Sequence, residues 1–239
     1  MDESKIKIKQ IGCLLIHGFG GNVDEVRPLA ECLKIKGYKV ESPLLTGHSG
    51  KRRDLKKCNY EDWIACAKEC YDRLHAECDT IYLVGFSMGG LISFQLSVKC
   101  KVDAIVTLNA PIYFWDFKRV GLNILQDFKD RKPDNFRRYI KSSIGLPFGA
   151  LINFRILLAK TKPILNQIVC PVFIVQGLED DTVRQKSANY IFYHIASQHK
   201  KLRFYKNADH VILWSKASKV VIRDVVDFLE DNVISNINL

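Results

Sequence analysis

The segment Gly85-Phe86-Ser87-Met88-Gly89 constrains the fold of this chain more than any other feature. It has the form Gly-x-Ser-x-Gly, and it lies between an apolar run typical of a buried strand, 81–84, and a run typical of a helix, 91–96. A tight turn between a strand and a helix would strain the serine backbone and hold its hydroxyl above the sheet, at a helix N-terminus that favours negative charge. Small residues are expected two positions either side, because a side chain there would collide with a neighbouring element. The pattern predicts that Ser87 is a nucleophile; the alternative is an ordinary serine in a glycine-rich turn.

Strand-like and helix-like segments alternate along most of the chain. Apolar runs typical of strands cover 11–16, 38–41, 81–84, 102–108, 172–176 and 202–205. Amphipathic segments typical of helices cover 24–36, 60–74, 91–96, 187–196 and 215–230. This alternation predicts parallel strands joined by crossover helices. We therefore expect one α/β domain over residues 1–239, with a mostly parallel central sheet and helices on both faces.

Two stretches depart from this alternation. The polar segment 44–59 is predicted to be a long loop. Residues 113–165 hold basic and aromatic helical segments interrupted by proline and glycine, with no clear strand. Because this stretch lies between two predicted core strands, we expect it to form a small helical cap insertion over the C-terminal edge of the sheet.

Charge and hydropathy narrow the classes of function. The chain carries 36 Lys and Arg against 26 Asp and Glu, a formal net charge of +10. Its densest basic run, 51–57, is predicted to be a solvated loop, since no motif for nucleic-acid binding accompanies it. No run of apolar residues is long enough for a membrane helix, and 1–9 lack the apolar core of a signal peptide. We therefore expect a cytoplasmic protein without a membrane segment or a nucleic-acid partner, although its charge favours contact with anionic surfaces.

The eight cysteines do not indicate a metal site or a disulfide framework. None of them forms a Cys-x-x-Cys pair, and the absence of a signal peptide favours reduced thiols. Cys66, Cys70 and Cys78, with His75 between them, fall on one helical pattern and match no zinc-binding spacing. We expect them to be core residues, and we expect no bound metal.

A nucleophilic serine needs a base, and the chain offers three histidines after a plausible acid. His194 falls within a predicted helix and is expected to point away from the sheet edge, and His199 lies in a basic turn. His210 follows a predicted strand and a short loop and precedes the last helix. From that position it can reach across the strand ends to Ser87, so His210 is the predicted base.

The orienting acid is expected directly after the strand at 172–176. Glu179, Asp180 and Asp181 all lie there, and a carboxylate at this point can accept the Nδ1–H of the histidine. The residues alone do not separate Asp180 from Asp181. Asp209 is a weaker candidate, because adjacent residues in a loop rarely point at each other.

The oxyanion formed during attack needs two backbone N–H donors. The residue after the nucleophile, Met88, is expected to supply one of them. The second is expected from the loop His17-Gly18-Phe19-Gly20-Gly21, whose glycines let the backbone bend toward the serine, with Phe19 as the donor. A phosphate-binding turn is the alternative for this loop, but it has neither a Gly-x-Gly-x-x-Gly nor a Gly-Lys-Ser/Thr motif.

Taken together, the motifs resemble those of the α/β-hydrolase superfamily, most closely the small bacterial carboxylesterases and monoacylglycerol-lipase-like esterases. The resemblance covers nearly the whole chain. The segments that carry it, in chain order, are Leu15-Ile16-His17-Gly18-Phe19-Gly20-Gly21, Thr46-Gly47-His48, Tyr60-Glu61-Asp62-Trp63, the serine turn, Val175-Gln176-Gly177-Leu178-Glu179-Asp180 and Asp209-His210-Val211. It implies an α/β-hydrolase fold with a cap insertion at about 113–165.

The resemblance also implies roles for the site residues. Ser87 would be the nucleophile, His210 the base, and Phe19 and Met88 the oxyanion donors. In the family pattern the acid lies several residues past the strand, shortly before a small hydrophobic residue, which favours Asp180 over Asp181. The implied activity is hydrolysis of short- to medium-chain carboxylic esters through an acyl-enzyme, without metal or cofactor. We expect a small-molecule ester substrate and a monomeric protein.

Other functions remain open at this point. The same residues are compatible with a monoacylglycerol lipase, with thioester, amide or lactone hydrolysis, and with acyl transfer, because fold and triad do not determine the substrate. A non-catalytic binding protein on the same scaffold is a further alternative. Such proteins usually lack a triad member, whereas all three are present here.

Overall fold

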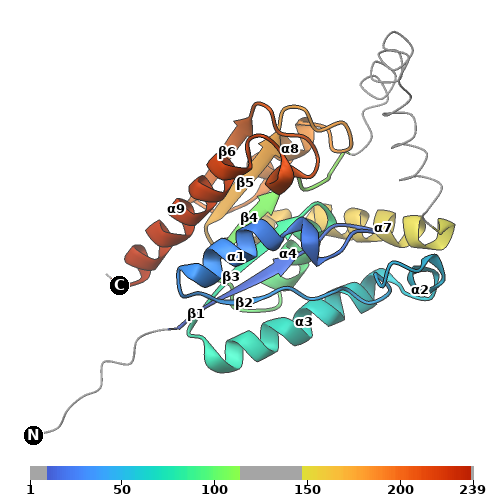
Figure 1. The fold of residues 1–239 in the computed structure, drawn as a ribbon, viewed down its shortest axis with the longest axis horizontal. Helices are drawn as coiled ribbons and strands as arrows, with labels where there is room; N and C mark the ends of the chain where they lie inside the picture. Colours follow the sequence, from blue (N-terminus) through green and yellow to red (C-terminus); the bar gives the residue numbers. More distant parts are fainter. Residues whose placement is uncertain (1–9, 114–146, 238–239) are drawn as a thin grey trace, which may run out of the picture.

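The computed structural model describes residues 10–113 and 147–237 (Figure 1). Most of the expected cap insertion, 114–146, lies outside the described residues, as does the N-terminal stretch 1–9. The described residues of the stretch expected to form this insertion include helix α7, Phe148–Thr161, which is followed by a 3-10 helix, η2, Lys162–Gln167.

A six-stranded sheet in the order β2-β1-β3-β4-β5-β6 forms the centre of the structure. Its strands are β1 Ile11–Ile16, β2 Lys39–Glu41, β3 Thr80–Phe86, β4 Ala104–Leu108, β5 Val172–Gly177 and β6 Lys200–Tyr205. Every neighbouring pair is parallel, which confirms the predicted topology. The carboxyl ends of all six strands consequently meet at one edge of the sheet.

Helices cover both faces of the sheet, as predicted (Figure 1). Helices α1 Arg27–Ile35 and α9 Ser218–Ile237 pack on one face. On the other face lie α3 Tyr60–Glu77, α4 Met88–Ser97, α7 and α8 Lys186–His194. Side chains of β3 alternate between these two layers. Tyr82 and Val84 lie in the apolar core on the side of α1 and α9, and Ile81 and Leu83 lie in the core on the opposite side of the sheet.

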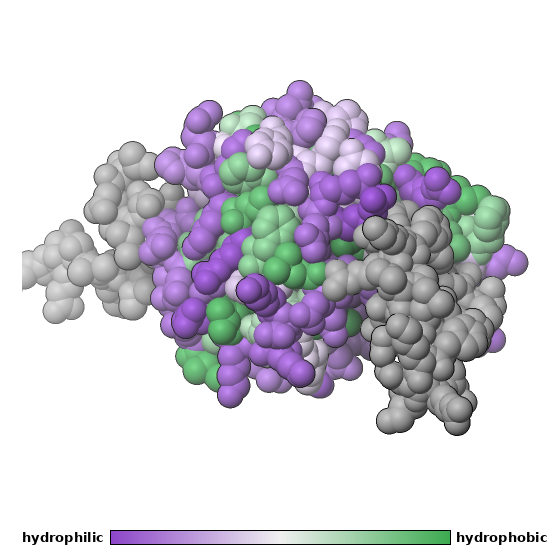
Figure 2. Space-filling view, turned by 90° about the horizontal axis from the view of Figure 1, so that it is seen from above, coloured by the Kyte–Doolittle hydropathy of each residue, from purple (hydrophilic) through white to green (hydrophobic). Residues whose placement is uncertain are grey.

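The surface is much more hydrophilic than the apolar core on either side of the sheet. Seen from above, hydrophilic residues cover most of the described surface, with smaller hydrophobic areas between them (Figure 2). None of the helices in the described part of the chain is both long and apolar enough to traverse a lipid bilayer. All eight cysteines are free thiols in the structure.

Two local predictions were wrong. The segment 44–59 is not entirely loop, because α2 forms at Arg52–Lys56, where the buried side chain of Leu55 anchors one helical turn to the core. The helix expected at 24–36 is divided into a 3-10 turn, η1, Val23–Glu25, and α1, which begins at Arg27. Pro28 fits the first turn of α1, where no N–H is needed.

Candidate active site

Ser87 occupies a strained turn between β3 and α4. Its φ of 50° and ψ of −117° lie in a region that residues other than glycine rarely adopt. A Cβ on Gly89 would collide with the carbonyl oxygen of Ile16, and a Cβ on Gly85 would collide with the backbone of Gly89. The requirement for small residues on both sides of the serine is therefore confirmed. The turn is fixed further by the Ser87 N–H, which donates to the Leu108 carbonyl at 2.8 Å.

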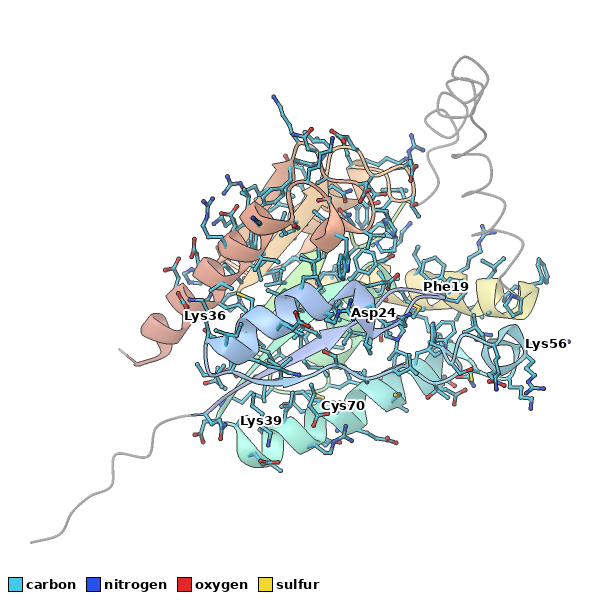
Figure 3. All side chains as sticks on the ribbon, viewed as in Figure 1. Phe19, Asp24, Lys36, Lys39, Lys56 and Cys70 are labelled. Atoms are coloured by element: carbon cyan, nitrogen blue, oxygen red, sulfur yellow. The ribbon has the colours of Figure 1, made fainter. Side chains whose placement is uncertain are left out.

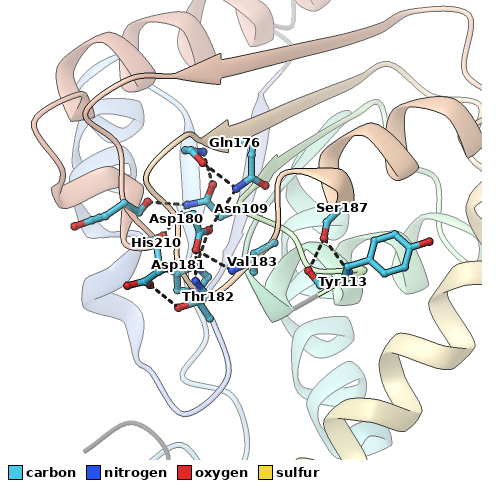
Figure 4. Close-up of polar contacts among 11 residues, drawn as sticks. Asn109, Tyr113, Gln176, Asp180, Asp181, Thr182, Val183, Ser187 and His210 are labelled. Carbon is cyan, nitrogen blue, oxygen red and sulfur yellow. Dashed lines mark hydrogen bonds and ion pairs between the residues drawn. The ribbon is translucent and has the colours of Figure 1, made fainter. Parts of the chain in front are cut away.

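Asp180 and His210 form a hydrogen-bonded pair at the carboxyl ends of the strands (Figure 4). His210 Nδ1 lies 2.9 Å from Oδ2 of Asp180, whose side chain is fully buried. The other carboxylate oxygen, Oδ1, accepts the N–H groups of Thr182 and Val183, both at 2.8 Å. These donors hold the carboxylate in one orientation, so that its second oxygen is presented to the imidazole.

Asp180 lies within hydrogen-bonding distance of His210 Nδ1, and the other candidate residues make different contacts. Asp181 accepts from the Thr182 hydroxyl at 3.2 Å, and Glu179 accepts the Asn207 N–H at 2.9 Å, so neither takes the place of Asp180 at the imidazole Nδ1. His194 turns back onto its own helix, with Nδ1 2.8 Å from the Tyr190 carbonyl. His199 is exposed ahead of β6.

Phe86, the residue before the serine, contacts the ring of His210. The ring of Phe86 lies 5.1 Å from the His210 ring, centroid to centroid. Within the described residues the Ser87 hydroxyl makes no hydrogen bond, so the serine–histidine contact is not formed in this state. Such contacts are often long without substrate and shorten when it binds.

The electrostatic environment favours the protonated form of His210. Burial of the imidazole is the largest influence and acts to lower its pKa. The charge and hydrogen bond of Asp180, with smaller contributions from the Glu25 and Asp181 carboxylates, outweigh burial and raise the pKa above its usual value. An imidazole in this setting is a stronger base toward a serine hydroxyl.

Asn109 joins the two loops that carry this pair, and sequence reasoning did not identify it as a site residue. It is fully buried at the end of β4 and has a φ of 51°. Its Nδ2 donates to the carbonyls of Asp209, at 2.9 Å, and His210, at 2.8 Å (Figure 4). Its Oδ1 accepts the Gly177 N–H at 2.7 Å. One side chain thus connects the histidine loop to the end of β5, from which the acid-bearing loop departs.

Replacing Asn109 with glycine is expected to lower kcat by roughly 10- to 100-fold with little change in KM, because the histidine loop loses its two side-chain donors. We also expect the free energy of unfolding to fall by about 2 kcal/mol, since buried backbone groups lose their partners. Steady-state kinetics and denaturant unfolding measure both effects. Asn207→Gly is the matched control, because Asn207 also has a positive φ, of 58°, but is exposed. Equal effects in the two variants would contradict the role of the Asn109 side chain.

The loop after β1 brings Phe19 to the same edge of the sheet. Its conformation is fixed by His17, whose Nδ1 lies 2.8 Å from the Gly18 carbonyl and whose Nε2 accepts the Leu45 N–H at 3.1 Å. Burial lowers the pKa of His17 to about 4, so this imidazole is neutral at physiological pH. The Phe19 ring stacks on Phe154 of α7 at 5.1 Å.

The backbone N–H groups of Phe19 and Met88 are the two predicted oxyanion donors. Neither N–H group donates a hydrogen bond to another described residue. The neighbouring Gly18 N–H, in contrast, donates to Oε2 of Glu25 at 2.9 Å. The loop therefore leaves the Phe19 N–H available for an incoming oxygen atom.

Comparison with known proteins identifies the family to which this arrangement belongs. The family model described as "alpha/beta hydrolase fold" matches residues 14–156. The chain belongs to the α/β-hydrolase family. The α/β-hydrolase fold implied by the resemblance of the motifs is thus confirmed.

Two curated proteins resemble this α/β-hydrolase over nearly its whole length. The thermostable monoacylglycerol lipase of Bacillus sp. (strain H-257) is 31% identical over 227 residues, covering 91% of this chain and 90% of the relative. The carboxylesterase of Bacillus subtilis (strain 168) is 29% identical over 224 residues and 91% of each chain. A solved structure from work on LipS and LipT, two metagenome-derived lipolytic enzymes, has the same fold, with a TM-score of 0.78, 22% identity, and 93% of this chain and 94% of that chain covered.

Proposed function

We propose that this α/β-hydrolase is a serine carboxylesterase that hydrolyses short- to medium-chain carboxylic esters through an acyl-enzyme. The observation that carries the proposal is the strained turn at Ser87 together with the His210–Asp180 hydrogen bond of 2.9 Å at the same edge of the sheet. The relatives named carboxylesterase and monoacylglycerol lipase support an ester-hydrolysing serine hydrolase.

In the proposed mechanism Ser87 Oγ attacks the ester carbonyl carbon while His210 Nε2 takes its proton. The carbonyl π electrons move onto oxygen, and the resulting oxyanion accepts the N–H groups of Phe19 and Met88. The tetrahedral intermediate collapses, the carbon–oxygen bond to the alcohol breaks, and His210 protonates the departing oxygen. Asp180 stays ionised and stabilises the imidazolium.

The second half of the proposed mechanism repeats these steps with water. His210 takes a proton from the water as its oxygen attacks the acyl carbon, and the same two N–H groups bind the oxyanion. Collapse then breaks the bond to Ser87 Oγ, which recovers its proton from His210, and the carboxylic acid leaves. Because nucleophile, base and donors all come from the chain, the reaction needs no metal ion or cofactor.

A monoacylglycerol lipase is the second candidate, favoured by the relative at 31% identity. It would use the same Ser87 chemistry and differ only in the chain length and alcohol it accepts. Thioester, amide or lactone hydrolysis and acyl transfer are further reactions on the same triad. A non-catalytic binding protein would need no reactive serine.

A series of p-nitrophenyl esters from acetate to palmitate, assayed beside 1- and 2-monoacylglycerols, separates the two candidates. We expect kcat/KM to peak at short or medium acyl chains and to exceed the value for monoacylglycerols. A peak at long chains, with monoacylglycerols preferred, would replace the carboxylesterase by the lipase. If no ester is cleaved and a fluorophosphonate probe fails to label Ser87, the proposal of an ester hydrolase is overturned.

A further inference from the structure

Glu25, the last residue of η1, places a carboxylate beneath the loop that carries Phe19. Its Oε2 accepts the Gly18 N–H at 2.9 Å. A Cβ on Gly21 would collide with the Glu25 carboxyl group, so the glycine-rich loop lies directly against that group. The carboxylate is therefore built into the loop and is not a surface charge that happens to lie near it.

Helix η1 and Arg27, the first residue of α1, contact Trp214 in the segment that follows His210. The indole Nε1–H of Trp214 donates to the Asp24 carbonyl at 2.8 Å, and the Arg27 guanidinium carbon lies 5.3 Å from the centroid of the Trp214 ring. In the view of Figure 3, Phe19 and Asp24 lie in the central part of the molecule, to the right of Lys36 and Lys39. Glu25 thus belongs to an element that contacts both the oxyanion loop and the histidine segment.

Three carboxylates act on His210, and they come from two different parts of the fold. Asp180 and Asp181 come from the loop after β5, and Glu25 comes from η1. Burial is the largest influence on Glu25 and raises its pKa overall, while the Gly18 N–H and the charge of His210 act in the opposite direction and favour the ionised carboxylate. Charges interact strongly across a partly buried site, so Glu25 and His210 influence each other's protonation.

We propose that Glu25 is a positioning residue of the esterase, whose ionised carboxylate holds the oxyanion loop through Gly18 and stabilises the imidazolium form of His210. The inference rests on the proposed function, since it assigns both effects to the acylation step. Proton transfer from Ser87 creates the imidazolium while the substrate oxygen becomes negative beside Phe19. Glu25 thereby connects the base and the oxyanion donor through one side chain.

Two substitutions separate the two effects. Glu25→Gln keeps an oxygen that can accept the Gly18 N–H but removes the charge. We expect the acid limb of its kcat/KM–pH profile to move to lower pH, because the pKa of His210 falls. Plateau kcat should fall by no more than a few-fold, because the imidazolium loses one of its stabilising charges while the loop keeps its acceptor. Glu25→Ala also removes the acceptor, so we expect the same shift with plateau kcat lower by roughly 10- to 100-fold and KM little changed.

Asp24→Asn is the matched control. It removes a carboxylate from the same 3-10 turn, but that carboxylate is exposed and pairs with Arg27, not with the loop. We expect its pH profile to match wild type. Circular dichroism and thermal unfolding establish that each variant is folded, and an NMR titration of the His210 imidazole protons, assigned with His210→Ala, gives the pKa without turnover.

The results distinguish the inference from the proposed function. A wild-type protein that cleaves esters, with a Glu25→Gln profile and His210 titration equal to wild type, would overturn the role of Glu25 and leave the esterase intact. A shift equal to that of Asp24→Asn would do the same. A wild-type protein inactive on every ester would overturn the esterase, and with it the catalytic meaning of Glu25. A lower His210 pKa in Glu25→Gln and in Glu25→Ala but not in Asp24→Asn, with the large loss of plateau kcat confined to Glu25→Ala, would support the proposal.

Discussion

Replacing Ser87 with alanine is expected to lower kcat toward p-nitrophenyl esters by roughly a million-fold, to the level left by substrate binding and the oxyanion donors. The reason is that no acyl-enzyme can form without the hydroxyl. We expect the free energy of unfolding to change by less than about 0.5 kcal/mol, because the hydroxyl makes no hydrogen bond to a described residue and alanine keeps the same backbone constraint. Steady-state kinetics and denaturant unfolding on the same preparation measure both quantities.

Ser93→Ala is the matched control for Ser87→Ala. Ser93 lies buried in α4, and its hydroxyl donates to the Gly89 carbonyl at 2.9 Å, so it contacts the serine turn without offering a nucleophile. We expect it to retain most of the activity and its labelling by a fluorophosphonate. Near-normal turnover in Ser87→Ala would remove Ser87 from the mechanism.

Replacing Asp180 with asparagine is expected to lower kcat by roughly 10⁴-fold. The amide can still accept the Thr182 and Val183 N–H groups through one oxygen, but it turns an N–H toward His210 and favours the wrong tautomer. The acid limb of the kcat/KM–pH profile should also move. Activity needs neutral His210, so it rises with pH through the raised pKa of that group; without the Asp180 charge the pKa falls and the limb moves to lower pH.

Asp181→Asn tests whether the hydrogen bond from a carboxylate to His210 Nδ1 is needed, or only a negative charge near His210. Asp181 also raises the pKa of His210, but as the smallest of the named contributions, and His210 Nδ1 is bonded to Asp180. We expect a small displacement of the acid limb and kcat within a few-fold of wild type, as is typical when a charge acts only through space. A loss in Asp181→Asn as large as that in Asp180→Asn would contradict the assignment of the acid.

The sequence predicted the serine turn well because its constraints are local. A serine between two glycines, after a buried strand and before a helix, leaves the backbone few alternatives, and Ser87, Gly85 and Gly89 take the expected geometry. The parallel sheet followed from the alternation of strand-like and helix-like segments for the same reason. The turn at α2 was missed because Leu55 makes it stable only through contact with the core.

Other features depend on contacts between distant parts of the chain. The choice of Asp180 over Asp181 rests on which carboxylate the Thr182 and Val183 N–H groups orient, and spacing alone does not reveal that. Asn109 acts on residues that lie about seventy to one hundred positions further along the chain. A polar residue at the end of an otherwise apolar strand was the available signal for Asn109. For Glu25, the signal was an acid soon after a glycine-rich loop.

The strained backbone at Ser87 costs folding stability at the same position where we propose that the side chain provides activity. Asn109 also has a positive φ, but its side chain returns three hydrogen bonds to the fold, whereas the Ser87 side chain returns none to a described residue. Glycine would relax the backbone at Ser87 but remove the hydroxyl that we propose as the nucleophile. If Ser87 is the nucleophile, as we propose, a directed-evolution campaign that selected this protein for heat resistance alone would tend to lose it, so such a campaign needs a selection for turnover in every round.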